Sequence, residues 1–326
     1  SDVCSSDLVG WTWDISVIFK RAFSFYFKEF YISIKILISL IALTLACSLA
    51  DNLQKSFSEG GIGDVAFITC FFLTAAVAVK SFLSCTGTAI KAIDDVIIFI
   101  NALIPITLTL LATSGGVASA GIFHPVLMLS VQIVPLVIKN IIMPLIMLST
   151  ALSVSGCVSG KNTVERLSKL FKSVAKWTLG IMLTAFVGII TVQSIAAPAF
   201  DGISVKTAKF AVGSLVPVVG SVLSETVDLV FGCSLIIKNA VGIAGLAAVI
   251  GICGIPLIRL IAQATIFSIA AAIAEPISDK RISDMLAKIG EGIMMTFVMV
   301  TVIMLMFIIN ITIIIGAGNT AAMLGR

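Results

Sequence analysis

The sequence is poor in charge. Asp, Glu, Lys and Arg together make up 12% of its 326 residues, whereas hydrophobic residues make up 59% and the mean hydropathy is +1.17. Soluble domains carry about 25% charged residues, so this composition excludes an ordinary water-soluble domain. About 20 apolar residues are enough to span a bilayer, and Gly292–Gly316 alone supplies 25 residues without a charge. The composition predicts an integral membrane protein.

Histidine and paired cysteines are scarce too. His124 is the single histidine, and none of the seven cysteines belongs to a Cys-x-x-Cys pair. A catalytic histidine needs a nucleophile and an orienting acid, and a zinc site needs several ligands at suitable spacing. We interpret His124 as a structural or interfacial residue and the cysteines as small buried side chains. The sequence therefore predicts no catalytic residue, no metal site and no cofactor.

A functional phosphate-binding loop is also missing. Gly156–Thr163 (GCVSGKNT) resembles one, but it is one residue short between its glycines, and Asn162 replaces the Ser or Thr that would hold magnesium. The net charge of +4 comes largely from one segment, so it indicates membrane topology rather than nucleic-acid binding. We expect no ATP hydrolysis and no nucleic-acid partner for this chain.

Apolar segments of spanning length recur along the chain. We predict an all-α, polytopic transmembrane helix bundle of about eight spans, with amphipathic helices at Trp11–Tyr31, Lys161–Lys176 and Ser278–Glu291. In Lys161–Lys176 the apolar stripe consists of Val164, Leu167, Leu170, Phe171 and Val174, and in Ser278–Glu291 it consists of Ile282, Met285, Leu286 and Ile289. The predicted spans are Ile32–Ala50, Val65–Cys85, Val117–Ile138, Ile141–Cys157, Trp177–Ala197, Thr226–Gly254, Ile255–Ile277 and Ile293–Ile315. Ser114–Gly115–Gly116 is predicted to break a helix, and Asp201–Lys209 to form a short polar loop.

One pattern of prolines occurs twice. Pro105 and Pro217 lie in similar apolar segments 112 positions apart (217 − 105), and Pro144 and Pro256 have the same offset (256 − 144). Doubled membrane units with interrupted helices are typical of transporters and channels. Pro removes an amide donor and costs about 3 kcal/mol inside a helix. The internal duplication is therefore the strongest pointer to function in the residues themselves.

The proline segments decide the predicted topology. We expect Val96–Thr113 and Phe210–Leu223 to be re-entrant or discontinuous helices, which gives each repeat three spans and opposite orientations. Lys161–Lys176 and Asp279–Glu291 would then lie on opposite sides, which fits the positive-inside rule. The alternative is that both segments are ordinary kinked spanning helices, and the repeats are then parallel.

We divide the sequence into five parts, two of which are the repeats. Residues 1–8 look non-native, because Asp2–Leu8 back-translates to a common sequencing adapter, and we expect the native start to be missing. The other parts are 9–64 (amphipathic helix and first span), 65–176 (repeat 1), 177–291 (repeat 2) and 292–326 (last span and tail).

Charged residues inside the apolar segments are the candidate functional positions. Placing a charge at the bilayer centre costs about 2.5–3.5 kcal/mol on insertion scales. The doublets Lys139–Asn140 and Lys238–Asn239, together with Arg259, are interpreted as a polar lining or as links between helices. The alternative is that each doublet marks a helix end at the membrane interface. The candidate counter-charges are Asp94, Glu225 and Asp228.

Glycines are frequent in the second repeat, and small residues allow membrane helices to approach closely. We predict that helix packing accounts for Gly213, Gly220, Gly242, Gly245, Gly251 and Gly254.

Several long sequence segments resemble those of a known family. Thr207–Asp228 (TAKFAVGSLVPVVGSVLSETVD), Ser234–Gly245 (SLIIKNAVGIAG) and Ile309–Asn319 (INITIIIGAGN) are similar to stage III sporulation protein AE of endospore-forming bacteria. FHPVLML from Phe123 and IKNIIMPLI from Ile138 are similar as well. The resemblance extends from about Trp11 to the C-terminus.

The resemblance implies a role in sporulation. It implies a non-enzymatic membrane subunit, in the mother-cell membrane around the forespore, of a secretion-like channel complex. Implied partners are a secretion-type ATPase, ring-forming proteins, other membrane subunits and the lipid bilayer. A permease-like core that supplies the forespore and supports late gene expression is the implied function; the alternatives are a structural scaffold for the ring and an independent secondary transporter.

Overall fold

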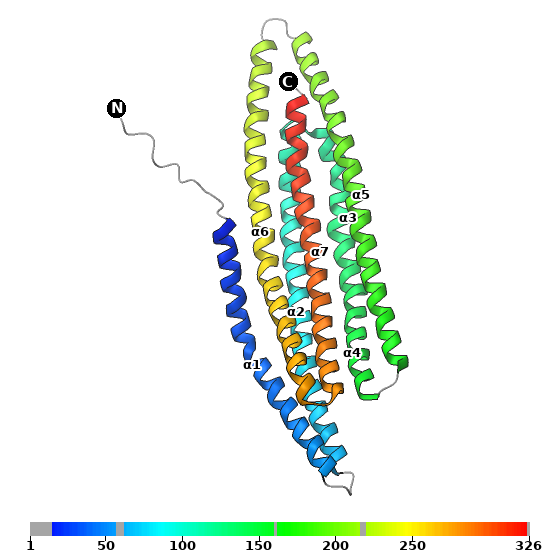
Figure 1. Cartoon of the computed structure of the whole chain (residues 1–326). Coiled ribbons are helices and arrows are strands. Elements are labelled where there is room, and N and C mark those ends of the chain that lie inside the picture. Colours follow the sequence, from blue (N-terminus) through cyan, green and yellow to red (C-terminus); the bar gives the residue numbers. More distant parts are fainter. Residues whose placement is uncertain (1–14, 57–61, 160–161, 216–219, 325–326) are drawn as a thin grey trace, which may run out of the picture.

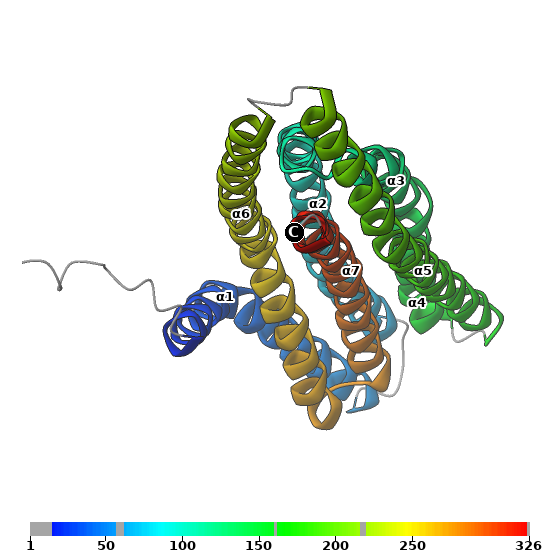
Figure 2. The ribbon, with the colours of Figure 1, turned by 90° about the horizontal axis from the view of Figure 1, so that it is seen from above.

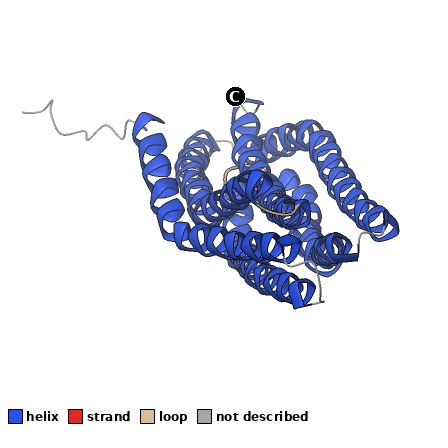
Figure 3. Cartoon of the chain, turned by 60° about the horizontal axis from the view of Figure 1, so that its bottom comes forward, coloured by secondary structure: helices blue, strands red, loops and turns tan. Residues whose placement is uncertain are grey.

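Long helices make up nearly all of the chain. The computed structural model describes residues 15–56, 62–159, 162–215 and 220–324, and every element in these ranges is helical (Figures 1 and 3). The predicted all-α membrane class is confirmed. The elements are α1 (Ile15–Ser56), α2 (Ile62–Thr113), α3 (Val117–Val137), the π-helix η1 (Ile138–Ile142), α4 (Met143–Ser159), α5 (Asn162–Leu215), α6 (Gly220–Ile277) and α7 (Lys280–Leu324).

The helices are longer than the predicted spans. In lipid, a backbone must satisfy its own hydrogen bonds, which favours uninterrupted helices. α2, α5 and α6 contain 52, 54 and 58 residues, so at about 1.5 Å per residue each is about 80 Å long. Within the described residues, six helices are long and apolar enough to cross a membrane, with α3, η1 and α4 counted as one. Segments predicted as neighbouring spans are thus halves of single helices.

Pro105 does not interrupt its helix. α2 continues through Pro105 to Thr113, so the prediction that Val96–Thr113 is a separate re-entrant segment is wrong. The hydroxyl of Thr109 donates to the carbonyl oxygen of Pro105 at 2.8 Å, which adds a local hydrogen bond one turn after the proline. Pro217 lies outside the described residues. Helix α2 ends instead at the predicted breaker, where Gly115 has φ 94° and turns the chain into α3.

The helices are arranged around α7. Viewed from above, α7 lies in the middle, with α6 on one side, α2 behind it and α5 on the other side (Figure 2). α3, η1 and α4 form one column that packs against α5. α1 lies on the outside, against α6 and α2, and diverges from the bundle axis (Figure 1).

The orientation of the repeats differs from the prediction. In repeat 1, α2 runs in one direction and the α3–α4 column runs back. In repeat 2, α5 runs in the direction of α2 and α6 runs back, so the corresponding helices of the two repeats are parallel (Figure 1). The two amphipathic connectors, Lys161–Lys176 and Asp279–Glu291, lie at the same end of the bundle. Lys172 Nζ is 2.6 Å from Glu291 Oε2, and Lys288 Nζ is 3.7 Å from Glu165 Oε1. The inverted-repeat prediction is wrong, and its physical cause is the continuity of α2 through Pro105.

The first connector also presents an unexpected face to the core. An amphipathic helix normally buries its apolar stripe, but Leu167, Leu170 and Val174 are 42–54% exposed. Ser168 and Lys172 are buried instead. The Ser168 hydroxyl lies 3.1 Å from that of Ser149 and 2.5 Å from that of Ser153, on α4, so hydrogen bonds select this face. In Ser278–Glu291 the predicted stripe is fully buried: Ile282, Met285, Leu286 and Ile289.

Two of the glycines permit close contact between helices. A Cβ atom on Gly242 would collide with the side chain of Ile315 on α7, and one on Gly245 would lie 2.8 Å from Leu103 Cδ2 on α2. The packing prediction fits these two residues. Gly251 and Gly254 have nothing within 4 Å of a built Cβ, so close packing does not explain them.

Candidate functional site

Lys139 lies in the π-helix and links two columns of the bundle. η1 spans Ile138–Ile142, the segment that contains the predicted Lys139–Asn140 doublet. Lys139 Nζ is 2.6 Å from Asp94 Oδ1 on α2, and the two side chains are 34% and 43% exposed. A π-helical turn inside a longer helix frequently marks a functional position. Asp94 was among the candidate counter-charges, whereas Asn140 is exposed to the surroundings of the bundle.

Lys238 is the most deeply buried of the candidate cations. It is 1% exposed within α6, and its Nζ donates to the main-chain carbonyl of Ile315 at 3.0 Å. Among the described residues, no carboxylate forms an ion pair with it. A lysine in this position needs its donor groups satisfied by protein oxygens or by water. Lys238 and Asn239 lie well inside α6, so this doublet does not mark a helix end.

Arg259 attaches α1 to the bundle. Arg259 Nε on α6 lies 3.3 Å from Glu29 Oε2 on α1, and the Glu29 side chain is only 12% exposed. The Tyr26 hydroxyl donates to Thr265 Oγ1 at 3.3 Å, one to two turns farther along α6. Sequence reasoning missed Glu29 as the partner. The available signal was its position in an amphipathic helix rich in aromatic residues.

Asp201 is a second polar residue that sequence reasoning placed wrongly. The segment from Asp201 to Lys209 was expected to be a polar loop, but Asp201 lies inside α5 and is 0% exposed. Its Oδ1 accepts a hydrogen bond from the backbone N–H of Ser119 at 3.0 Å. Ser119 lies in the first turn of α3, where N–H groups lack intrahelical partners, and the N-cap Gly116 offers no side chain. Asp201 thus caps α3 from another helix.

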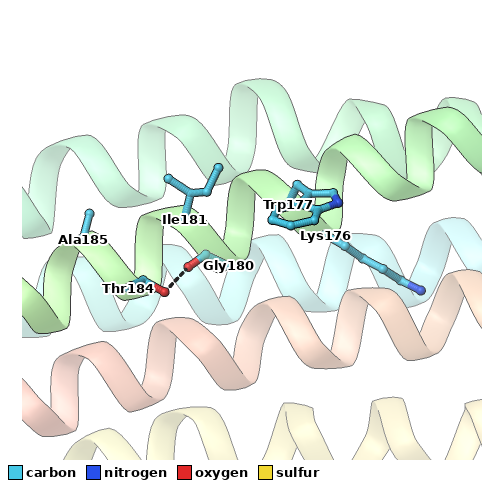
Figure 4. A pocket seen from close by; sticks show the side chains of 6 residues that line it. All are labelled: Lys176, Trp177, Gly180, Ile181, Thr184 and Ala185. Atoms are coloured by element: carbon cyan, nitrogen blue, oxygen red, sulfur yellow. Dashed lines mark hydrogen bonds between the residues drawn. The ribbon is translucent and has the colours of Figure 1, made fainter.

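The described surface includes one shallow depression, of about 630 Å³, on α5 (Figure 4). All of its lining residues belong to that single helix: Lys176, Trp177, Gly180, Ile181, Thr184 and Ala185. The Thr184 hydroxyl there is already used locally, since it donates to the Gly180 carbonyl at 2.9 Å. A substrate site normally brings polar groups from several elements together in a cleft. The depression therefore lacks the features of an active site.

The remaining chemical groups are dispersed. Within the described part of the chain, no three His, Cys, Asp or Glu side chains are close enough to hold a metal ion. His124 is an exposed residue of α3. What the geometry does offer is a set of charged groups inside long apolar helices, at Asp94, Lys139, Lys238 and Arg259. Such groups are costly in a membrane and usually face the interior of a bundle or a water-filled path.

Comparison with known proteins identifies the family. The family model described as stage III sporulation protein AE matches residues 6–318. The chain belongs to this family. A relative named stage III sporulation protein AE, from Bacillus subtilis (strain 168), is 37% identical over 305 residues, which cover 94% of this chain and 76% of the relative. No solved structure matches the chain.

Membership of the stage III sporulation protein AE family, together with six apolar helices of spanning length, makes this chain an integral membrane protein of sporulation. The family is not a known enzyme family.

The pair between α1 and α6 leads to a first prediction. We expect Arg259→Met to weaken the attachment of α1, because it leaves the nearly buried Glu29 carboxylate without its cation. Limited proteolysis in detergent should cleave α1 several-fold faster in this variant. The matched control is Lys80→Met, since Lys80 is an exposed lysine inside α2. Equal cleavage rates in the two variants would show that Arg259 does not hold α1.

Proposed function

We propose that this chain is a non-enzymatic, permease-like subunit of the sporulation complex between mother cell and forespore, located in the mother-cell membrane around the forespore. Membership of the stage III sporulation protein AE family supports the setting. The observation that supports a permease-like core is the placement of charged side chains inside long apolar helices, above all the buried Lys238. Burial of the Lys238 ammonium inside the bundle, against a main-chain carbonyl, is costly, and a protein that only had to sit in the bilayer would not need it.

The proposed partners are a secretion-type ATPase, ring-forming proteins and other membrane subunits of the complex. The chain has no ATP-binding loop of its own, so energy has to come from a partner or from a gradient. Residues Lys139, Lys238 and Arg259 are the positions proposed to line a path or to link the helices that surround it, with Asn140 and Asn239 beside them.

Affinity purification from sporulating cells tests the proposed membership of a complex. A tagged chain solubilised in mild detergent should bring down the ATPase and the ring proteins at the stage when the forespore is engulfed. An unrelated polytopic membrane protein with the same tag is the control. Recovery of the tagged chain alone, after gentle chemical cross-linking in the cell, would contradict a role in a complex.

One alternative function is retained because of the same buried lysine. An independent secondary transporter also carries charged groups at the level of the membrane. Purified chain in liposomes should then move a solute without any partner. We expect no transport by the chain alone, and transport under these conditions would replace the complex-subunit proposal by the transporter.

A further inference from the structure

Charged residues are unevenly distributed along the bundle axis. Five helical columns each contain a stretch of at least 18 residues without Asp, Glu, Lys or Arg, which is at least about 27 Å of helix. The stretches are residues 96–113 of α2, 117–138 of α3 and η1, 178–200 of α5, 239–258 of α6 and 292–324 of α7. We call this part of the bundle the charge-free half.

Contacts between helices show that these stretches lie side by side. Asp94 and Lys139 form an ion pair just before the stretch of α2 begins and just after that of α3 and η1 ends. At the opposite end, Asp201 on α5 binds the backbone of Ser119 on α3. Between these levels, the Asn310 amide on α7 donates to Ser130 Oγ on α3 at 3.2 Å.

Helix α6 is aligned with the same layer. Gly245 of α6 lies against Leu103 in the charge-free stretch of α2, since a Cβ atom added to this glycine would be 2.8 Å from the Leu103 side chain. Lys238 and Arg259 bound the stretch of α6, 21 positions apart (259 − 238), and are therefore separated by about 32 Å along the helix. The hydrocarbon core of a bilayer is about 30 Å thick. The charge-free stretch of α6 thus has the thickness of one hydrocarbon core. The stretch of α7 is longer and continues past this layer to Gly292, which lies beside Thr150 on α4.

Aromatic side chains mark one boundary of this layer. Trp177 directly precedes the stretch of α5 and is 70% exposed. Tyr31 is 75% exposed and lies two residues from Glu29, whose partner Arg259 ends the stretch of α6. Exposed Trp and Tyr residues concentrate at the level of the lipid headgroups. Lys176, beside Trp177, adds an exposed cation at the same level.

The rest of the bundle carries charge on several helices. Lys172 and Glu291 join α5 to α7, and Lys288 lies beside Glu165. This part, the charged half, consists of the beginnings of α2, α5 and α7, the end of α6 and most of α1. It also includes α4, which itself has no Asp, Glu, Lys or Arg. It also exposes apolar side chains, such as Phe72 and Leu148. Exposed apolar surface therefore does not distinguish the two halves, whereas the charged residues of α1, α2, α5, α6 and α7 do.

We propose that the hydrocarbon core of the bilayer surrounds the charge-free half, and that the charged half stands outside it on one side of the membrane. Five columns then cross the bilayer: α2, α3 with η1, α5, α6 and α7. α1 does not cross on its own, since it leaves the boundary at Glu29 and runs along the charged half, where Ser48 Oγ donates to the Ile277 carbonyl at 2.6 Å. The placement does not depend on the function proposed above.

Quenching of tryptophan fluorescence by brominated phosphatidylcholine tests this placement in the full chain. All variants carry Trp11→Phe and Trp13→Phe, so that Trp177 is the single reporter. With Trp177→Phe added, the reporter is moved to exposed positions by Ile189→Trp, Leu167→Trp or Leu49→Trp. Ile189 lies 12 positions after Trp177, inside the charge-free stretch, and Leu167 lies 10 positions before Trp177, outside it. These separations are about 18 Å and about 15 Å along α5.

We expect the Ile189→Trp reporter to be quenched most strongly by bromines near the end of the acyl chains. Trp177 should respond mainly to bromines near the headgroup, and Leu167→Trp and Leu49→Trp should be quenched several-fold less by either lipid. Circular dichroism checks that each variant keeps its helical content. Quenching of Leu167→Trp or Leu49→Trp as strong as that of Ile189→Trp, or a Trp177 response centred on the deep bromines, overturns the placement.

Discussion

Among single exchanges in α6, Gly242→Leu is expected to destabilise the bundle most. A Cβ at this position would collide with the side chain of Ile315, so a leucine fits only if Ile315 changes its rotamer or α6 and α7 move apart. These two helices share the most extensive contact in the fold. Overpacking of this kind costs about 1–3 kcal/mol, and more where the backbone has to shift. Thermal unfolding in detergent measures the loss.

A second glycine of α6 supplies the matched control. A Cβ atom added to Gly251 would have no neighbouring atom within 4 Å. Gly251→Leu removes a glycine from the same helix without a steric conflict, and the higher helix propensity of leucine should leave stability equal or slightly raised. If Gly242→Leu unfolds at the same temperature as Gly251→Leu, the close approach of α6 and α7 is not a feature of the folded protein.

Loss of the Lys139 charge is expected to have the second-largest effect on stability. Lys139→Met leaves Asp94 without the cation that lies 2.6 Å away. An unpaired carboxylate at the edge of the hydrocarbon layer should lower the free energy of unfolding by about 1–3 kcal/mol, below the cost of a charge at the bilayer centre because both side chains are partly exposed. Thermal or denaturant unfolding in detergent gives the difference.

The double exchange Asp94→Asn with Lys139→Met separates the charge effect from lost packing. It removes both charges, so it should recover most of the stability that Lys139→Met loses. Lys169→Met is the control, because the side chain of Lys169 is 74% exposed and, among the described residues, pairs only with Glu165 in its own helix. No recovery in the double variant would show that the stability depends on the lysine side chain itself and not on the ion pair.

The sequence allowed the membrane class and several local features to be predicted. A low charge content and long apolar runs indicate membrane helices directly, because each residue contributes independently to the signal. The Ser114–Gly115–Gly116 turn was predicted because glycine readily adopts a positive φ. Lys139 and Lys238 were singled out because a charge in an apolar segment is costly, and both make contacts with another helix.

Features that depend on contacts between distant segments could not be predicted in the same way. Lys172 is buried because Glu291, 119 positions farther along the chain, accepts its hydrogen bond. Asp201 is buried because it caps a helix that begins 84 positions earlier (201 − 117). Pro105 was expected to break a helix, but the tertiary packing of α2 outweighs the local cost of a proline. Periodicity and propensity do not contain this information.

The most direct test of a permease-like core measures forespore supply in cells whose complex is fully assembled. Lys238→Met removes the buried charge of α6, and Lys169→Met removes an exposed one. Affinity purification confirms equal assembly of both variants, and a late forespore reporter then gives the output per complex. We predict a several-fold loss of output for Lys238→Met and normal output for Lys169→Met. Normal output from fully assembled Lys238→Met complexes would contradict a role of this lysine in a path and would favour a structural scaffold.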